Sequence, residues 1–457
     1  MQLECARVRI GSATAISWLA ALAILSARPA AAAISATPAA AAVLQATVTG
    51  GTVAGTVDTQ HGIASFKGIP FAAPPVGELR WKAPHPVVAW KGIKQADAFA
   101  DSCPQEHEKS IRGSEDCLYL NVWTGAKTRH DKRPVMVWIY GGGFNGGATS
   151  LPAYDGTHFA QEGVVFVSIA YRVGVLGFLA HPELSRESGN GSGAYGLQDQ
   201  IAALKWIKDN ISEFGGDPDR VTIFGQSAGG ISVHFLTIAP SARGLFRYVI
   251  SESGGAILQP PRIDTEGASS LQSLGFAESV GQRFLQSLDA SDLASARQIP
   301  AQRLLEAATK SPPWYWWVVV DGNVLPGTSF DLYQHGSFTD TPILIGYNSD
   351  DRHEDPPSHG TVAWFEDYVA HAHNQCPSMM KAILAAYPHR TDAEATQAYR
   401  DLFLDTWYGG NTWTWARMHN HYGRSSTYVY YFDIHPPGKC DLPGFEAREY
   451  AAGVAFE

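Results

Sequence analysis

The chain has 457 residues, of which 45% are hydrophobic and 17% are charged, so it can bury a large core and is a globular protein rather than a disordered one. Its formal net charge is −10 at pH 7, and its Lys and Arg residues form no cluster that could serve as the basic face of a nucleic-acid-binding protein. No Pro/Ser-rich linker, repeat or long charge run divides the sequence after the first fifty residues, and we expect one large domain over residues 45–457.

The first 33 residues have the features of a secretory signal peptide. Arg7 and Arg9 precede an apolar run that ends near Leu25, and alanines at 31–33 offer an A-x-A type cleavage site. A membrane anchor is the alternative interpretation, but the apolar run is shorter than the roughly 20 residues that a membrane span requires. We therefore expect residues 1–33 to be removed, no stable membrane span to remain, and the protein to be secreted or periplasmic.

The cysteine content agrees with export. Cys5 would leave with the signal peptide, and an even number of cysteines then remains in an oxidising compartment. Two disulfides are possible, in three pairings, among Cys103, Cys117, Cys376 and Cys440. No C-x-x-C unit occurs, and the His-x-His pairs that begin at His371 and His419 have no nearby partners, so we interpret them as surface histidines and predict no metal site.

Apolar strands alternate with helical patterns along the chain. One helical pattern, "GLQDQIAALKWIKDNI", has apolar residues at helical spacing and is ended by "FGGDPDR". Nearly continuous apolar strands are typical of a sheet that is covered on both faces, and the alternation predicts an α/β fold with a mostly parallel sheet and helices on both faces. The expected strands are 135–139, 164–171, 221–224, 248–251, 341–347 and 427–432.

Three glycines, Gly141 to Gly143, follow the expected strand 135–139 almost directly. Because glycine has no side chain, the backbone N–H groups of such a run can approach a ligand closely. The run is therefore a candidate for part of an oxyanion hole, in which backbone donors stabilise the charge that develops on a carbonyl oxygen.

Ser227 has the sequence context of a nucleophile elbow. It follows the expected strand 221–224, precedes the helical pattern "AGGISVHFL", and is the centre of a G-x-S-x-G motif at 225–229. The glycines are needed because the turn is too sharp for side chains on either flank. The helix start directs N–H groups, including that of Ala228, toward a developing oxyanion. Since a serine hydroxyl is nearly inert without a base beside it, the motif predicts a serine nucleophile whose base lies elsewhere in the chain.

The sequence as a whole resembles the type-B carboxylesterases, the branch of the α/β-hydrolases that also contains the cholinesterases and the non-catalytic neuroligins. The matching segments follow the family order and cover most of residues 55–351. The resemblance implies the α/β-hydrolase fold, a small-molecule ester as substrate, and no metal or cofactor. The segments are "FKGIPFAAPPVGELRWKAP", "SEDCLYLNVW", "VMVWIYGGGFNGG", "YRVGVLGFL", "GLQDQIAALKWIKDNISEFGGDPDRVTIFGQSAGG", "SESGG", "VVDGNVLP" and "ILIGYNSDD".

The resemblance also implies roles for individual residues. Ser227 matches the nucleophile, and Ser253 matches a serine that supports the catalytic triad. Tyr140 stands where many members have histidine, although tyrosine also occurs there. Cys103 and Cys117 match the family's N-terminal disulfide, which leaves Cys376 and Cys440 as a second candidate pair. The implied oxyanion donors are the N–H groups of Gly142, Gly143 and Ala228.

The acid of the triad departs from the family pattern. Where the family usually has N-x-x-E-G, this chain has Asn-Ser-Asp-Asp-Arg at 348–352. Asp351 therefore occupies the acid position, and Arg352 replaces a glycine. Aspartate orients an imidazole in many triads, as glutamate does in others, so we assign the acid to Asp351, with Asp350 and Glu354 as alternatives.

The general base is the second departure. In the family, a G-x-x-H-x-x-E/D segment after a Y-x-Y-x-F strand carries the catalytic histidine, and the match places Tyr450 at that histidine and Gly453 at the following acid. A phenol with a pKa near 10 stays protonated at pH 7 and cannot replace imidazole. His435 is the other candidate, although it directly follows the strand. The chain ends at Glu457, where the family continues into a further helix; truncation, a sequence error or loss of catalysis would each explain this ending.

Two functions are compatible with these features. The first is a secreted serine hydrolase that cleaves carboxylic esters through an acyl-enzyme on Ser227. The second is a catalytically weakened or inactive binding or adhesion module, as in the neuroligin branch. The complete elbow and glycine run favour the hydrolase, whereas the missing histidine favours the module. The aromatic cluster at 314–317 either lines an acyl or alcohol pocket or belongs to core and surface packing.

Overall fold

The computed structural model describes residues 43–257, 271–349, 351, 360–372 and 377–433, and all of them belong to one compact unit, Ala41–Glu457. Several predictions concern other parts of the chain. The expected signal peptide and the second candidate cysteine pair lie outside the described residues. So do Asp350, Arg352, Glu354, His435, Tyr450 and Gly453.

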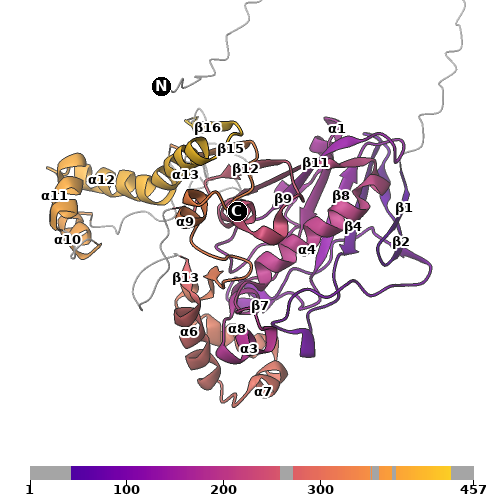
Figure 1. Ribbon diagram of the computed structural model, residues 1–457, viewed down its shortest axis with the longest axis horizontal. Coiled ribbons are helices and arrows are strands. Elements are labelled where there is room, and N and C mark those ends of the chain that lie inside the picture. Colours follow the sequence, from indigo (N-terminus) through magenta and orange to yellow (C-terminus); the bar gives the residue numbers. More distant parts are fainter. Residues whose placement is uncertain (1–42, 258–270, 350, 352–359, 373–376, 434–457) are drawn as a thin grey trace, which may run out of the picture. The chain divides into compact units, whose positions relative to one another are not determined.

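A mixed sheet of nine strands forms the centre of the described part of the chain (Figure 1). Six neighbouring strands, from β10 to β16, run parallel to one another, which confirms the mostly parallel sheet predicted from the sequence. The remaining three pair antiparallel at the β3 end of the sheet. In spatial order the strands are β16 (Thr427–Phe432), β15 (Ile343–Asn348), β12 (Tyr248–Glu252), β11 (Gly216–Gln226), β9 (Arg133–Ile139), β10 (Val165–Ile169), β8 (Tyr119–Thr124), β4 (Ile63–Pro70) and β3 (Thr56–Asp58).

The two faces of this sheet differ in chemistry. In β9, the fully buried Val135 and Ile139 lie on one face, because alternate side chains of a strand point to opposite sides. Trp138 lies on the other face, where its ring is 4.9 Å from that of Phe224, and Phe166 is 6.1 Å from Phe224. The sheet therefore has an aliphatic face and an aromatic face.

Helices cover both faces, as the sequence predicts. On the aromatic face, Phe159 of α1 (Thr157–Gln161) stacks on Phe166 with ring centroids 4.9 Å apart. On the aliphatic face lies α5 (Ala228–Ile238), because a Cβ atom at Gly225 of β11 would come within 2.6 Å of the backbone of Gly229 in α5. The helix α4 (Tyr195–Asn210) contacts both α5 and β11 and crosses the sheet in Figure 1.

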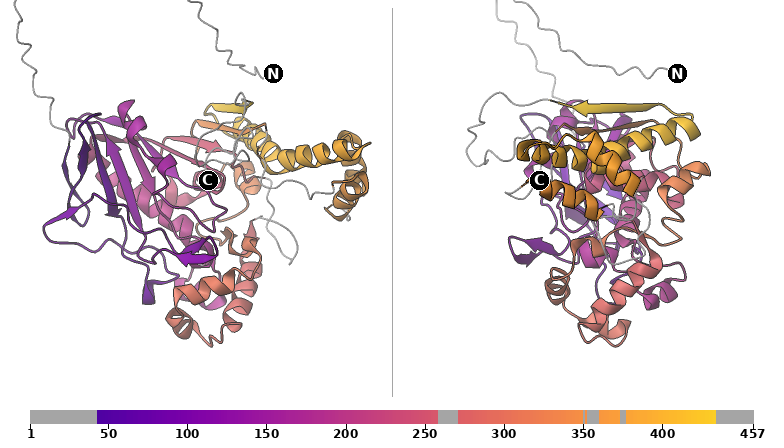
Figure 2. Two further views of the ribbon diagram at one scale, coloured as in Figure 1. Left: turned by 180° about the vertical axis from the view of Figure 1, so that it is seen from behind. Right: turned by 90° about the vertical axis from the view of Figure 1, so that its left-hand side faces the viewer.

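A second hydrophobic cluster joins α10, α11 and α12, which are drawn in orange in Figures 1 and 2. These three helices are α10 (Val362–Ala372), α11 (Pro377–Ala386) and α12 (Asp392–Leu404). The remaining helices are α2 (Gly174–Phe178), α3 (Pro182–Ser188), α6 (Leu274–Gln286), α7 (Leu293–Gln298), α8 (Ala301–Ala308), α9 (Ser329–Gln334) and α13 (Gly410–Tyr422). The short strands are β1 (Gln45–Val48), β2 (Gly51–Ala54), β5 (Ile93–Gln95), β6 (Gln105–His107), β7 (Ser110–Arg112), β13 (Gln272–Ser273) and β14 (Val319–Val320).

None of the helices in the described ranges is long and apolar enough to cross a membrane. Cys103 and Cys117, the pair implied by the family resemblance, are joined by a buried disulfide with a Cα–Cα distance of 5.0 Å. The disulfide ties the segment before β6 to the residues that lead into β8, a sequence separation of 14.

Replacing Cys103 and Cys117 together with alanine is expected to lower the free energy of unfolding by about 3 kcal/mol, because the crosslink removes chain entropy from the unfolded state for a loop of this length. Urea unfolding followed by tryptophan fluorescence measures the difference. The reduced wild-type protein should match the double variant. Equal stability of the oxidised wild type and the double variant would contradict this prediction.

Candidate active site

Ser227 stands in the turn between β11 and α5. Its backbone has φ +54° and ψ −124°, in a region that residues with a side chain rarely adopt and that costs on the order of 1–3 kcal/mol. The surrounding backbone holds this conformation: the N–H of Ser227 donates to the carbonyl oxygen of Glu252 at 2.9 Å, and its carbonyl oxygen accepts from Ile231 at 2.8 Å. The structure therefore gives Ser227 the strained strand-to-helix turn that a nucleophile elbow requires.

The flanking glycines of the motif have a steric reason. A Cβ atom at Gly225 would lie 2.5 Å from the carbonyl oxygen of Ile139, and one at Gly229 would overlap the same oxygen. Any larger residue would push α5 away from β9. The G-x-S-x-G spacing thus allows the close contact between α5 and the sheet that holds Ser227 at the turn.

The glycine run after β9 lies against Ser227. A Cβ atom at Gly141 would come within 3.1 Å of the Cβ atom of Ser227. Gly142 has φ +100° and a Cβ atom there would lie 2.5 Å from the oxygen of Gly146, whereas Gly143, at φ +58°, faces open space. The first residue of α5, Ala228, has an N–H group without an intrahelical acceptor, as in any helix. The structure thus brings together the three residues expected to donate to an oxyanion.

Tyr140, the residue before the glycine run, is held by contacts with Tyr171. Its hydroxyl donates to the carbonyl oxygen of Tyr171 at 3.1 Å and accepts from the N–H of Tyr171 at 3.2 Å, while the two rings stack with centroids 4.5 Å apart. Complete burial raises the pKa of the Tyr140 hydroxyl above its usual value. Tyr140 therefore anchors the start of the glycine run to the segment that follows β10, and its protonated hydroxyl takes no proton from a substrate.

Asp351 and Ser253 meet at the carboxyl ends of β12 and β15. The hydroxyl of Ser253 donates to Oδ2 of Asp351, and the N–H of Asn348 donates to the same oxygen at 3.3 Å. Asp351 is only 6% exposed. Ser253 is itself fixed, because its N–H donates to the carbonyl oxygen of Gly346 at 2.8 Å. This arrangement holds the Asp351 carboxyl in one orientation beside the elbow.

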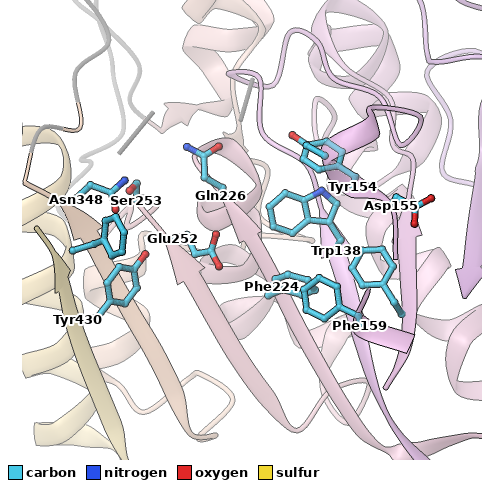
Figure 3. Close-up of a pocket in the computed structure, with 13 residues that line it drawn as sticks. Trp138, Tyr154, Asp155, Phe159, Phe224, Gln226, Glu252, Ser253, Asn348 and Tyr430 are labelled. Carbon is cyan, nitrogen blue, oxygen red and sulfur yellow. The ribbon is translucent and has the colours of Figure 1, made fainter. Parts of the chain in front are cut away.

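A cavity of about 420 Å³ opens next to the elbow on the aromatic face of the sheet (Figure 3). Its polar side comes from the ends of β11, β12, β15 and β16, and its apolar side from β9, β10, β11 and the segment that includes α1. Ser227 is adjacent to two of its lining residues: Gln226 precedes it in the chain, and the carbonyl oxygen of Glu252 accepts its N–H. The polar lining residues are Gln226, Glu252, Ser253, Asn348 and Tyr430, and the aromatic ones include Trp138, Tyr154, Phe159, Phe166 and Phe224.

Two groups that line this cavity, the Glu252 carboxyl and the Tyr430 hydroxyl, have pKa values above their usual range. Burial raises the pKa of the Glu252 carboxyl. Burial also raises the pKa of the Tyr430 hydroxyl, and the nearby carboxyls of Glu252 and Asp351 raise it further. Both groups therefore hold their protons more strongly than they would in water.

The sequence analysis did not identify this cavity. The one available signal was the alternation in "VMVWI" and "VTIF", which places Trp138 and Phe224 on one face of two strands that turn out to be neighbours. Two residues of the aromatic cluster at 314–317, considered as a pocket wall, pack in the core: Trp316 lies 4.7 Å from Phe284, and Trp317 lies 4.8 Å from Phe144 in the glycine loop.

No histidine lines the cavity within the described ranges. Two histidines are completely buried elsewhere: His234 on α5, whose ring lies 4.2 Å from Trp415, and His419 on α13. His234 follows Ser227 by seven residues, about 10 Å along the helix axis, too far to accept its proton. The interpretation of His419 as a surface histidine was wrong, because the helical period places it with Trp415 on the inner face of α13.

Comparisons with known proteins agree with this arrangement. Residues 41–452 match the carboxylesterase family. Over 366 residues the chain is 40% identical to the fumonisin B1 esterase of Sphingopyxis macrogoltabida, covering 78% of this chain and 65% of that protein. It is 34% identical to the para-nitrobenzyl esterase of Bacillus subtilis (strain 168) over 87% of this chain and 80% of the relative.

Solved structures of similar proteins have the same fold as this chain. A PNB esterase structure superposes with a TM-score of 0.72 at 34% sequence identity, over 86% of this chain and 81% of that one. The sheet order, the strand-to-helix turn at Ser227 and the match over residues 41–452 are consistent with one another. The chain belongs to the carboxylesterase family, a family of ester hydrolases with the α/β-hydrolase fold.

Proposed function

We propose that the protein cleaves carboxylic esters by forming an acyl-enzyme on Ser227. The observation that carries the proposal is the strained backbone of Ser227, at φ +54°, with the glycine run directly against it. Strain of this kind persists only where surrounding structure enforces it, and it is concentrated at functional sites. The names of the similar proteins, a fumonisin B1 esterase and a para-nitrobenzyl esterase, support an ester as substrate.

In the proposed mechanism the Ser227 oxygen attacks the ester carbonyl carbon as a base removes its proton. The negative charge moves to the carbonyl oxygen, where the N–H groups of Gly142, Gly143 and Ala228 stabilise it; each such donor is typically worth about 10²–10³ in rate. Collapse of the tetrahedral intermediate expels the alcohol, which takes the proton back from the base. Water then attacks the acyl-enzyme in the same way and releases the acid.

Asp351 has the role of orienting the base in this proposal. Its carboxyl is buried and held by Ser253 and by the N–H of Asn348, so it can accept an N–H of an imidazole in a fixed direction and stabilise the imidazolium that forms. No histidine among the described lining residues of the cavity supplies this imidazole. The position that matches the family's histidine carries Tyr450, which weakens the proposed activity in this chain.

A fluorophosphonate probe tests the nucleophile. We expect the probe to label the folded protein, Ser227→Ala to abolish the label, and the same variant to reduce p-nitrophenyl acetate hydrolysis to the uncatalysed rate, because the attacking oxygen is gone. The exposed Ser110→Ala serves as the matched control and should retain the label. Labelling that survives in Ser227→Ala would show that another residue reacts.

A binding or adhesion module is the second candidate function, favoured by the absence of a histidine among the cavity residues of the described ranges. It predicts a folded protein that the fluorophosphonate does not label. Circular dichroism on the unlabelled protein separates this outcome from simple misfolding.

We also infer that the protein is exported. The apolar run behind Arg7 and Arg9 supports this, and so does the buried disulfide between Cys103 and Cys117, since disulfides persist in oxidising compartments. Protein recovered from the periplasm or the medium should begin shortly after residue 33 when its N-terminus is sequenced. Recovery of the chain with residues 1–33 intact and both cysteines reduced would contradict export.

A further inference from the structure

The cavity beside Ser227 has an unusual charge pattern. Two carboxylic acids line it, Glu252 and Asp155, and the described residues contribute no lysine, arginine or histidine to its wall. Asp155 is exposed at the rim, where its carboxyl already accepts the N–H of Thr157 at 2.9 Å. Glu252 lies at the end of β12 and, in Figure 3, between Tyr430 and Phe224.

The Glu252 carboxyl has no hydrogen-bond or ion-pair partner within the described ranges. On the aromatic side of the same cavity, the indole N–H of Trp138 also lacks an acceptor there, and this side chain is only 8% exposed. A half-buried carboxyl and a buried N–H without partners each lose hydrogen bonds to water without replacement. A ligand that supplies a charged donor to Glu252 would remove the larger of these two penalties.

The walls favour the same kind of ligand. Trp138, Tyr154, Phe159 and Phe224 present aromatic rings to the cavity, and the negative faces of such rings attract cations as well as apolar groups. A neutral apolar ligand would fill the cavity but leave Glu252 unpaired. Among the described lining residues, an anion would meet two carboxyls and no positive charge. The aromatic lining and the charge of these residues therefore favour a cation with an apolar body.

We propose that this cavity binds the ammonium group of a primary or secondary amine, with Glu252 as its anionic partner, and that the preferred esters carry such an amine on an apolar body. The inference rests on the proposed function of Ser227. The backbone of Glu252 accepts the N–H of Ser227 at 2.9 Å, so the two residues are neighbours at the carboxyl ends of β12 and β11.

The hydrogen-bonding requirement sets the order of preference among cations. A primary ammonium offers N–H donors to the Glu252 carboxyl and a positive charge to the rings. A quaternary ammonium offers the charge alone, because it has no N–H. Since a hydrogen bond to a charged group strengthens binding, the primary amine should bind at least about tenfold more tightly than its trimethylated form.

Isothermal titration with three probes of one size class tests the proposal: 2-phenylethylamine, its N,N,N-trimethyl derivative and 2-phenylethanol. At pH 7 we expect the primary amine to bind at least tenfold more tightly than the alcohol, with the trimethyl compound between them. In Glu252→Gln the ratio of amine to alcohol affinity should fall to near one. Glu162→Gln removes an exposed carboxyl outside the cavity and should keep the wild-type ratio.

Equal affinity of the amine and the alcohol for the wild type would overturn the inference, as would a preference that survives Glu252→Gln or no binding of any probe. The wild-type comparison decides the question even if Glu252→Gln fails to fold, which circular dichroism would show. Because titration requires no turnover, the wild type separates the two proposals: selective amine binding by a protein that hydrolyses no ester supports the inference while the proposed function fails, and hydrolysis without amine selectivity does the reverse.

Discussion

Replacing Tyr450 with histidine is expected to raise kcat/KM for p-nitrophenyl acetate by about 10²–10⁴, the contribution that a positioned general base usually makes. A serine hydroxyl must lose its proton as it attacks, and a phenol with a pKa near 10 cannot accept that proton at pH 7. Without a base, catalysis comes from the oxyanion hole and substrate binding, about 10³–10⁴ over water. Initial rates from pH 5 to pH 9 should rise with pH through the imidazole pKa, near 6.5 if unperturbed.

Two variants control this experiment. Tyr450→Phe removes the hydroxyl without supplying a base and should leave the low activity unchanged. Gly453→Glu, added to Tyr450→His, restores the acid of the family pattern and should raise the activity further. If the wild-type chain already hydrolyses the ester rapidly, with the same pH profile, and loses this activity in His435→Ala, then His435 is the base and the assignment to position 450 is wrong.

The central parallel strands, such as β9 and β10, were predictable because most of their residues are buried on both faces. A continuous apolar run such as "VVFV" has no polar residue to place on a solvent face, so composition indicates a strand in the middle of a sheet. The expected strand 427–432 coincides with β16, and 248–251 differs from β12 by one residue. The expected strand 221–224 was too short, because β11 begins at Gly216 in the polar segment that was assigned to a turn.

The antiparallel strands were harder to predict, because their sequences have less of the apolar pattern that is typical of strands. β4 contains Lys67, Gly68 and Pro70, and β8 contains a buried Asn121. These residues are uncommon in strands, yet here they have partners: the side chain of Asn121 accepts the N–H of Gly68 at 2.9 Å and donates to Ser168 at 3.0 Å. Such tertiary hydrogen bonds are invisible to a propensity argument, so the segments were recognised only through the family resemblance.

The same distinction applies to the candidate site. Ser227 and the glycine run are local motifs whose spacing is set by a single turn or loop, and the structure brings them together. The cavity beside them depends on the packing order of β9, β10 and β11, which no local pattern specifies. Its carboxyl, Glu252, is one residue of the segment "SESGG", in which the resemblance drew attention only to Ser253.

Acid is expected to destabilise the fold through His234. The ring is completely buried on α5, and neither of its nitrogens has a hydrogen-bond partner within the described ranges. Burial, together with the neighbouring His419, lowers its pKa from 6.5 to about 3. In the unfolded chain the same imidazole takes up a proton near pH 6.5. Its folded pKa is the lower one, so the unfolded state binds more protons between these two values, and stability falls as the pH falls from about 6.5 toward about 3.

Each pH unit in this window costs about 1.4 kcal/mol per group, so at pH 5 His234 alone should remove about 2 kcal/mol relative to neutral pH. His419 acts in the same direction, because burial lowers its pKa despite the opposing charge of Asp340. His234→Phe keeps an aromatic ring against Trp415 but cannot be protonated. Urea unfolding at pH 7 and pH 5 should therefore show a smaller loss of stability in His234→Phe than in the wild type, by about 2 kcal/mol.

The matched control is His130→Phe, which removes an exposed histidine and should retain the wild-type difference between the two pH values. The comparison isolates the buried imidazole, because every carboxyl in the protein titrates equally in all three chains. If His234→Phe loses as much stability at pH 5 as the wild type does, then the native protein admits a protonated imidazole at this position. In that case α5 and α13 must move apart enough to hydrate the ring, and the contact between His234 and Trp415 does not hold these helices together in acid.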